Sequence, residues 1–336
     1  MRRDERLATP TVDARQESLR SDAPMSPSTQ QRAAPGVACS IPLPGDFRVA
    51  DVLAFHGRDA LALAERIDGH SLHKGLTWQG QPACLRIDFG PSRAEVRLTV
   101  DGPARTTPQE LAGMARRILG LTQPVEDFTR ACRAHPQLGP LIDRLPGLRV
   151  PLSATPFEAL TWAITGQQIS LRAAIALRRR LIEAAGVRHS TGLACYPDAA
   201  RIAALDASEL HRAGFSRAKA QTIGLLSREV AANRLPLETW LTTLPVDAMR
   251  EHLLRLRGIG PWTVDYTLLR GFGWLDGSLH GDAAVRRKLQ RLLGPAAAVT
   301  PDFTRRWLAQ FSPWRALVAA HLWAMPDECP SGNGAD

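Results

Sequence analysis

Residues 253–265 read LLRLRGIGPWTVD, a Gly-Ile-Gly turn between two segments of helical composition. Glycine tolerates the positive φ of a tight turn, and Pro261 suits the first turn of the helix that follows. Backbone N–H groups exposed at such a helix start can bind a phosphate without reading base sequence, helped by the helix dipole. The turn therefore indicates contact with a nucleic-acid backbone, although an ordinary helical hairpin has the same pattern.

An aspartate, Asp282, lies 22 residues beyond the second glycine of this turn, at the predicted start of a helix over 282–292. Taken alone, an aspartate at this place is a helix N-cap. Hairpin, loop and aspartate at this spacing together resemble the HhH-GPD superfamily of DNA glycosylases. The resemblance implies that Asp282 is the catalytic carboxylate.

Further motifs narrow the resemblance to the 3-methyladenine glycosylase II family of that superfamily. They are FEAL (157–160), ITGQQIS (164–170), SPWR (312–315) and HLW (321–323). The likeness runs in order over about 150–325, and the segment before it fits the family's N-terminal domain. It implies a monofunctional DNA N-glycosylase that flips alkylated bases such as 3-methyladenine and 7-methylguanine out of duplex DNA. Hydrolysis would leave abasic sites, as in base excision repair.

The resemblance also assigns the other site residues. It implies a base pocket formed by Trp262, Tyr266, Trp323 and Phe55, and Gln168 as the wedge that fills the gap left by the flipped nucleotide. It implies DNA-backbone binding by Gly258, Ile259, Gly260 and Thr263. The backbone carbonyls of Leu254, Arg257 and Ile259 would hold a structural Na⁺ or K⁺, and we expect no other cofactor.

The chemistry fits these residue types. Adenine alkylated at N3 and guanine alkylated at N7 are cationic and leave readily, so a single carboxylate that stabilises an oxocarbenium-like sugar suffices. Electron-rich aromatic faces should attract such a base. Trp262 and Tyr266 are four residues apart and therefore share one helix face. Aromatic residues at this spacing more often belong to a core, and we assign Trp240, Trp307 and Trp314 to the core.

Gln168 and Gly281 depart from the family, and Trp262 separates the chain from bifunctional relatives. Trp262 occupies the position where bifunctional glycosylases carry a lysine, so we expect no abasic-site lyase activity. Gln168 stands where some members have leucine, and Gly281 stands where members often have a second aspartate. The five cysteines are widely spaced, which argues against an iron–sulfur cluster or a zinc site.

Patterning along the chain indicates an α+β fold. Residues 1–37 are polar and predict a disordered tail. Residues 38–120 predict a small antiparallel-sheet domain, with a hairpin of strands at 83–89 and 94–100 between helices at 57–68 and 107–120. Residues 121–330 predict an all-α helix-hairpin-helix glycosylase domain. Its predicted helices cover 155–186 with a break at Gly166, then 206–213, 216–232, 246–256, 261–272, 282–292, 301–309 and 313–324.

The charge balance agrees with an anionic partner. The chain carries 42 basic and 33 acidic residues, and ten of the basic residues but only four of the acidic ones lie within 255–315. Such an excess favours salt-sensitive binding of double-stranded DNA. The sequence shows no membrane-spanning segment and no signal peptide. We therefore expect a monomer in the cytoplasm, associated with the nucleoid.

Three alternatives remain open at this stage. A helix-hairpin-helix protein could recognise alkylated DNA without cutting it, and would not depend on Asp282. A glycosylase for deaminated or oxidised bases would need more hydrogen-bonding groups in its pocket than this aromatic set offers. Finally, the basic surface of an all-α scaffold could reflect genome composition, because all but three of the basic residues are arginine.

Overall fold

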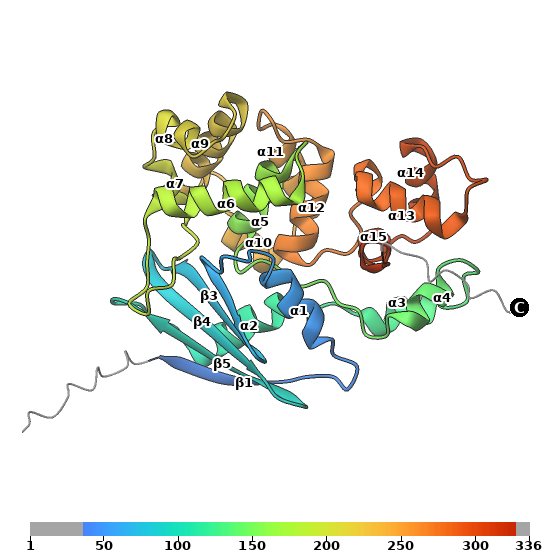
Figure 1. Ribbon diagram of the computed structural model, residues 1–336, viewed down its shortest axis with the longest axis horizontal. Helices are drawn as coiled ribbons and strands as arrows, with labels where there is room; N and C mark the ends of the chain where they lie inside the picture. The colour runs from blue at the N-terminus through green and yellow to red at the C-terminus, as the bar shows by residue number, and fades with distance from the viewer. Residues whose placement is uncertain (1–35, 327–336) are drawn as a thin grey trace, which may run out of the picture. The chain divides into compact units, whose positions relative to one another are not determined.

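The computed structural model describes residues 36–326, which fall within one compact unit. An antiparallel sheet is followed by helices, so the expected α+β fold is confirmed (Figure 1). The tail expected over 1–37 lies almost entirely outside the described residues, and the first strand begins at Val37. None of the helices between 36 and 326 has the length and apolar character needed to cross a membrane.

Five strands form the sheet, in the order β1-β5-β4-β3-β2. Their bounds are β1 Val37–Pro42, β2 Glu65–Asp68, β3 Ser71–Trp78, β4 Gln81–Phe89 and β5 Arg93–Val100. The predicted hairpin is β4 and β5, paired from Ala83 with Val100 to Phe89 with Ala94. Helix α2 (Pro108–Ile118) starts at a capping box formed by Thr107 and Glu110, and its apolar face completes the core of the sheet.

The prediction of a helix over 57–68 is wrong. Helix α1 covers Val49–His56 and ends at Gly57, and the chain then turns into β2, where Glu65 pairs with Lys74 of β3. The segment has an apolar spacing that a helix could use. Contacts of Glu65 with residues distant in sequence select the strand instead, and a local pattern cannot report such contacts.

The remaining helices agree with the sequence to within a few residues at each end. The expected ones are α5 Pro156–Gly166, α6 Leu171–Ala185, α8 Ala207–Arg212, α9 Arg217–Ala231, α11 Val246–Leu254, α12 Pro261–Phe272, α13 Ala283–Leu293, α14 Pro301–Ala309 and α15 Arg315–Ala324. Four more were not expected: α3 Val125–Cys132, α4 Gly139–Arg144, α7 Ala199–Ala203 and α10 Leu237–Thr243. The break at Gly166 lies between α5 and α6, as predicted.

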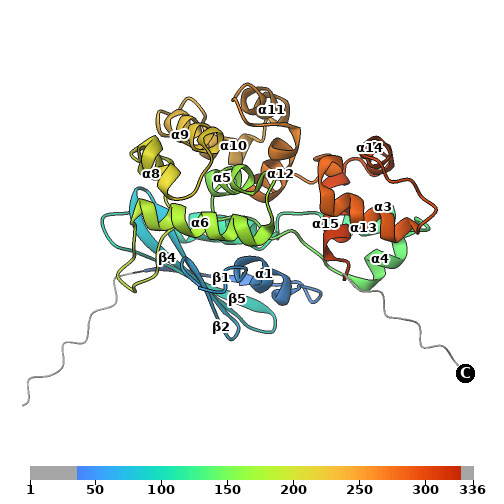
Figure 2. The same ribbon diagram turned by 45° about the horizontal axis from the view of Figure 1, so that its top comes forward.

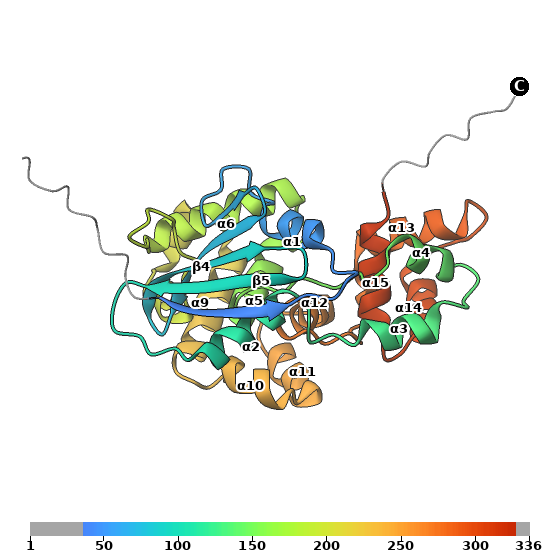
Figure 3. The same cartoon turned by 90° about the horizontal axis from the view of Figure 1, so that it is seen from below.

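The helices pack around two hydrophobic cores that share α12. Helices α3, α4 and α13–α15 gather on one side, and α5–α11 gather on the other (Figures 2 and 3). One face of α12 supplies Tyr266 and Leu269 to the first core, and the opposite face supplies Val264, Leu268 and Phe272 to the second. Helix α12 is therefore held from both sides, and this fixes the positions of the side chains on its first turns.

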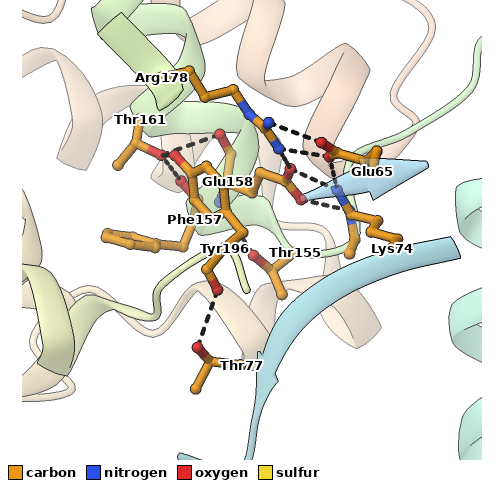
Figure 4. Close-up of polar contacts among 10 residues, drawn as sticks. Glu65, Lys74, Thr77, Thr155, Phe157, Glu158, Thr161, Arg178 and Tyr196 are labelled. Carbon is orange, nitrogen blue, oxygen red and sulfur yellow. Dashed lines mark hydrogen bonds and ion pairs between the residues drawn. The ribbon is translucent and has the colours of Figure 1, made fainter. Parts of the chain in front are cut away.

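A buried group of four charges joins the sheet to α5 and α6 (Figure 4). Lys74 Nζ lies 2.5 Å from Glu65 Oε1 and 2.7 Å from Glu158 Oε1, and Arg178 binds the same two carboxylates at 2.6–2.9 Å. Burial alone would raise the pKa of Glu65, but the charges of Arg178 and Lys74 hold it well below its usual value. We call these four residues the ion cluster.

The ion cluster also alters the N-terminal cap of α5. Thr155 accepts the backbone N–H of Glu158, as a capping box requires. The Glu158 carboxylate, however, accepts the N–H of Ala154 at 3.1 Å and binds the two cations of the cluster. The start of α5 is therefore fixed to the sheet, which sets where its C-terminal end lies.

Candidate active site

Asp282 follows a 3-10 turn (Leu279–Gly281) and caps α13. Its Oδ1 accepts the backbone N–H groups of Ala284 at 2.9 Å and Val285 at 3.0 Å. A role as helix cap is compatible with the expected role as catalytic carboxylate, because the same carboxylate also faces aromatic side chains. These backbone bonds fix the rotamer of Asp282 and leave it partly exposed.

Two tryptophans donate to this carboxylate. Trp262 Nε1 lies 3.0 Å from Asp282 Oδ2, and Trp323 Nε1 lies 3.3 Å from Oδ1. Tyr266 stands between them, with its ring centroid 5.3 Å from that of Trp262 and 6.3 Å from that of Trp323. The structure thus brings three of the four expected pocket aromatics into one group around Asp282.

Phe55, the fourth expected pocket residue, joins this group through an arginine. The guanidinium carbon of Arg270 lies 4.4 Å from the centre of the Phe55 ring and 5.6 Å from that of Trp323. Arg58 covers Phe55 at 4.1 Å and Trp162 at 4.7 Å. Trp162 in turn donates its N–H to the Tyr266 hydroxyl at 2.9 Å.

The glycine turn has the expected geometry at one of its two glycines. Gly258 has φ of 89°, and a Cβ there would lie 2.3 Å from Thr222 Oγ1, so only glycine fits. Gly260 is extended at φ −107°, with open space where a Cβ would stand. Gly260 is followed directly by Pro261, the first residue of α12. The first N–H groups of this helix have no partner within it and could bind a phosphate.

The side chains of the other two hairpin residues, Ile259 and Thr263, are buried and stabilise the turn. Ile259 is buried in the second helical core, and its N–H donates to the Leu256 carbonyl at 3.1 Å. Thr263 is buried, and its hydroxyl accepts from Gln167 Nε2 at 2.9 Å. Any contact of these two residues with a DNA backbone would therefore run through the main chain of the turn rather than through their side chains.

Gln168 occupies the turn between α5 and α6 in a left-handed conformation, at φ 58°, and is exposed. Its neighbour Gln167 fixes this turn to the hairpin by donating to the Gly258 carbonyl at 2.9 Å. Lys219 of α9 donates to the carbonyls of Thr165 and Gln167, both at 2.8 Å. The expected wedge is thus held in register with the expected phosphate-binding turn.

The carbonyls proposed for a monovalent cation lie at the same hairpin. The carbonyl of Arg257 accepts a hydrogen bond from Thr222 Oγ1 at 3.0 Å, which uses one of its two lone pairs. Leu254 ends α11 and is 43% exposed. Oxygen ligands of this kind suit a hard cation, so the carbonyls of Leu254, Arg257 and Ile259 are chemically suitable.

Three members of this group were not predicted from the sequence: Trp162, Arg58 and Arg270. Arg270 could have been found, because it continues the four-residue spacing of Trp262 and Tyr266 along α12. Arg58 lies three residues after Phe55, in a segment for which the sequence predicted a helix. Trp162 lies in an almost wholly buried helix, where its polar N–H gave no distinguishing signal.

Two family models match the chain. The model of the HhH-GPD superfamily base excision DNA repair protein matches residues 161–312, and that of the AlkA N-terminal domain matches residues 40–155. The first range contains the hairpin and Asp282. The second contains the sheet and Phe55.

Relatives carry similar descriptions. The chain is 32% identical over 199 residues to "DNA-3-methyladenine glycosylase 2" of Escherichia coli K12, an alignment that covers 57% of this chain and 66% of that protein. It is 30% identical over 214 residues to the "probable bifunctional transcriptional activator/DNA repair enzyme AlkA" of Mycobacterium tuberculosis, covering 62% of this chain and 41% of that protein. The chain therefore spans less than two thirds of the length of either relative.

Among solved structures, a 3-methyladenine DNA-glycosylase from Archaeoglobus fulgidus is similar with a TM-score of 0.70 at 22% identity. The match covers 85% of this chain and 97% of that chain. At this identity the likeness concerns the fold, which agrees in both the sheet and the helical regions.

Proposed function

We propose that the chain is a member of the HhH-GPD superfamily of base excision DNA repair proteins and a monofunctional DNA N-glycosylase for alkylated bases. Its substrates would include 3-methyladenine and 7-methylguanine in double-stranded DNA, and its product would be an abasic site. The observation that carries this proposal is the carboxylate of Asp282, which is held by two indole N–H groups beside a set of aromatic rings. The names of the relatives support the same activity.

In this proposal Asp282 acts on the sugar. Breaking the bond between base and sugar leaves positive charge on the deoxyribose, and a fixed carboxylate stabilises that charge. The four hydrogen bonds that Asp282 accepts hold its oxygens in place before the reaction, so little reorganisation is required. The carboxylate would also orient the attacking water.

The partners of the lysines support hydrolysis rather than lyase chemistry. A Schiff base needs an amine close to the sugar carbon. Lys74 is buried in the ion cluster, Lys219 binds carbonyls at the end of α5, and Lys288 donates to the Met325 carbonyl at 2.6 Å. These are the three lysines of the chain, and each donates to a partner other than Asp282.

We propose that the hairpin turn binds a phosphate of the DNA backbone through Gly258, Ile259, Gly260 and Thr263, while Gln168 enters the base stack. The link from Gln167 to Gly258 keeps these two functions at a fixed spacing. A Na⁺ or K⁺ held by the carbonyls of Leu254, Arg257 and Ile259 would add positive charge next to that phosphate. The enzyme would act as a monomer in the cytoplasm, on the DNA of the nucleoid.

Release of free bases from methylated duplex DNA tests the proposal. The purified full chain is incubated with the DNA, and 3-methyladenine and 7-methylguanine are measured by chromatography. We expect both bases to be released, and we expect the abasic strand to stay intact until alkali is added. Binding of methylated DNA without any base release would overturn the proposal in favour of a non-catalytic binding protein.

A further inference from the structure

Two arginines cover aromatic rings of the group around Asp282. The guanidinium carbon of Arg58 lies 4.1 Å from the ring centre of Phe55, and that of Arg270 lies 4.4 Å from the same ring. Arg58 also covers Trp162 at 4.7 Å, and Arg270 lies 5.6 Å from the ring of Trp323. All four distances fall within the range of a cation–π contact.

The same rings lead directly to the carboxylate. Trp323 contacts Arg270 on its face and donates its N–H to Asp282. Trp162, which Arg58 covers, donates to the hydroxyl of Tyr266, and Tyr266 stands between the two tryptophans that bind Asp282. A base that reaches these aromatics would therefore meet both guanidinium groups.

Neither arginine is neutralised by a carboxylate within residues 36–326. Arg270 donates to the backbone carbonyl of Pro151 at 2.7 Å, and the described part of the chain gives Arg58 no ion pair. Burial lowers the pKa of Arg270 to about 10; Tyr266 opposes this shift, and the nearby charge of Arg58 adds to it. Arg270 is therefore still cationic at neutral pH.

The charge on the leaving base decides how two cations affect the reaction. The electron pair of the glycosidic bond departs with the base, so a cationic alkylated base leaves as a neutral molecule. A neutral base leaves with a negative charge, which water then protonates. Guanidinium groups repel the first kind of base before the reaction and stabilise the second kind as it departs. A guanidinium group carries N–H donors that suit the oxygens and ring nitrogens of a neutral purine. The described residues give Arg58 only cation–π contacts, whereas Arg270 already donates one N–H to the Pro151 carbonyl.

We propose that Arg58 and Arg270 determine the specificity of this site by favouring neutral damaged purines with hydrogen-bond acceptors, such as hypoxanthine, relative to cationic bases. This inference rests on the proposed glycosylase function. Cationic bases remain substrates because they leave readily without help. The two arginines supply the hydrogen-bonding groups that the aromatic residues alone do not offer to a deaminated base.

Single-turnover excision from two duplexes of the same sequence tests the inference. One duplex carries hypoxanthine and the other carries 7-methylguanine, and the ratio of the two rates is compared between wild type and Arg58→Gln. We expect Arg58→Gln to lower the hypoxanthine rate about tenfold while leaving the 7-methylguanine rate equal or higher. Arg97→Gln, on the exposed face of β5, removes the same charge far from the pocket and should leave the ratio unchanged.

A second variant separates charge from folding. Arg58→Lys keeps the positive charge, and it should retain a ratio within about threefold of wild type. A ratio in folded Arg58→Gln equal to that of wild type would overturn the inference, as would a drop in Arg58→Lys as large as that in Arg58→Gln. Wild type that releases 7-methylguanine but no hypoxanthine would also overturn it and leave the glycosylase function standing. Wild type that releases neither base would instead refute the proposed function.

Discussion

The indole N–H of Trp262 donates to Asp282 Oδ2 at 3.0 Å and so joins the first turn of α12 to the cap of α13. The hairpin that would bind the DNA backbone and the carboxylate that would act on the sugar are therefore connected by one hydrogen bond. Trp262 both presents an aromatic face and orients Asp282. These two roles can be separated by substitution.

Trp262→Phe keeps an aromatic ring and removes the donor to Asp282. A hydrogen bond to a charged group contributes enough that its loss should slow base excision by roughly 10- to 100-fold. Single-turnover release of 7-methylguanine measures the effect. Trp78→Phe is the matched control, since it removes the indole hydrogen bond from Trp78, at the end of β3, to Thr106. Equal rates for wild type and Trp262→Phe would show that the contact does not orient the carboxylate.

Gln168 carries the second prediction, because it holds an unusual backbone conformation at φ 58° on the exposed turn. Gln168→Ala should reduce excision from duplex DNA by about fivefold, while excision from single strands, which need no filled gap, should change little. Gln79→Ala, also an exposed glutamine turn position at φ 49°, controls for the backbone conformation. If Gln168→Ala slowed excision from single-stranded substrate by the same factor, Gln168 would not act as the wedge.

The ion cluster should contribute to stability through its balance of charges. Lys74→Met leaves two buried carboxylates with one arginine, and it should lower the free energy of unfolding by about 3 kcal/mol. Adding Glu158→Gln restores the balance and should recover part of that loss. Urea denaturation measures both changes. Arg130→Met, which breaks an exposed pair with Asp127, should cost less than about 1 kcal/mol. A double variant no more stable than Lys74→Met would contradict the account.

His321 should make the fold sensitive to mild acid. It is buried against Phe128, and burial lowers the pKa of its imidazole to about 4. The unfolded chain takes up this proton near pH 6.5 and the folded chain near pH 4, so stability is complete above pH 6.5 and falls as the pH drops between these values. From pH 7 to pH 5 wild type should lose about 2 kcal/mol more than His321→Gln.

Thermal or urea unfolding at the two pH values measures this difference. His70→Gln changes an exposed histidine and should keep the pH dependence of wild type. An identical loss in wild type and His321→Gln would show that His321 is not the group that titrates.

Local signals in the sequence predicted the elements that carry the site. The Asp282 cap located the start of α13, and the glycines located the turn before α12. What local signals could not supply was long-range packing. The pairing of Glu65 with Lys74 and Arg178 turned an expected helix into a strand, and α3 and α4 pack with helices more than 100 residues away in the chain.

The same limit applies to the site. Trp262, Tyr266, Asp282 and Trp323 came from a family resemblance, and the structure places them in contact. The arginines that cover Phe55 were missed because cation–π contacts join side chains from α12 and from the end of α1. No spacing within one segment reports such a contact, although the series Trp262, Tyr266 and Arg270 was visible.

Asp282→Asn tests the central claim most directly. Asparagine caps a helix about as well as aspartate, so the variant should keep α13 and its melting temperature. The account predicts that single-turnover release of 3-methyladenine from methylated duplex DNA falls at least about 100-fold while DNA binding is retained. Asp198→Asn, at the cap of α7, should keep the wild-type rate. An Asp282→Asn protein that releases the base within about threefold of the wild-type rate would contradict the catalytic role of this carboxylate.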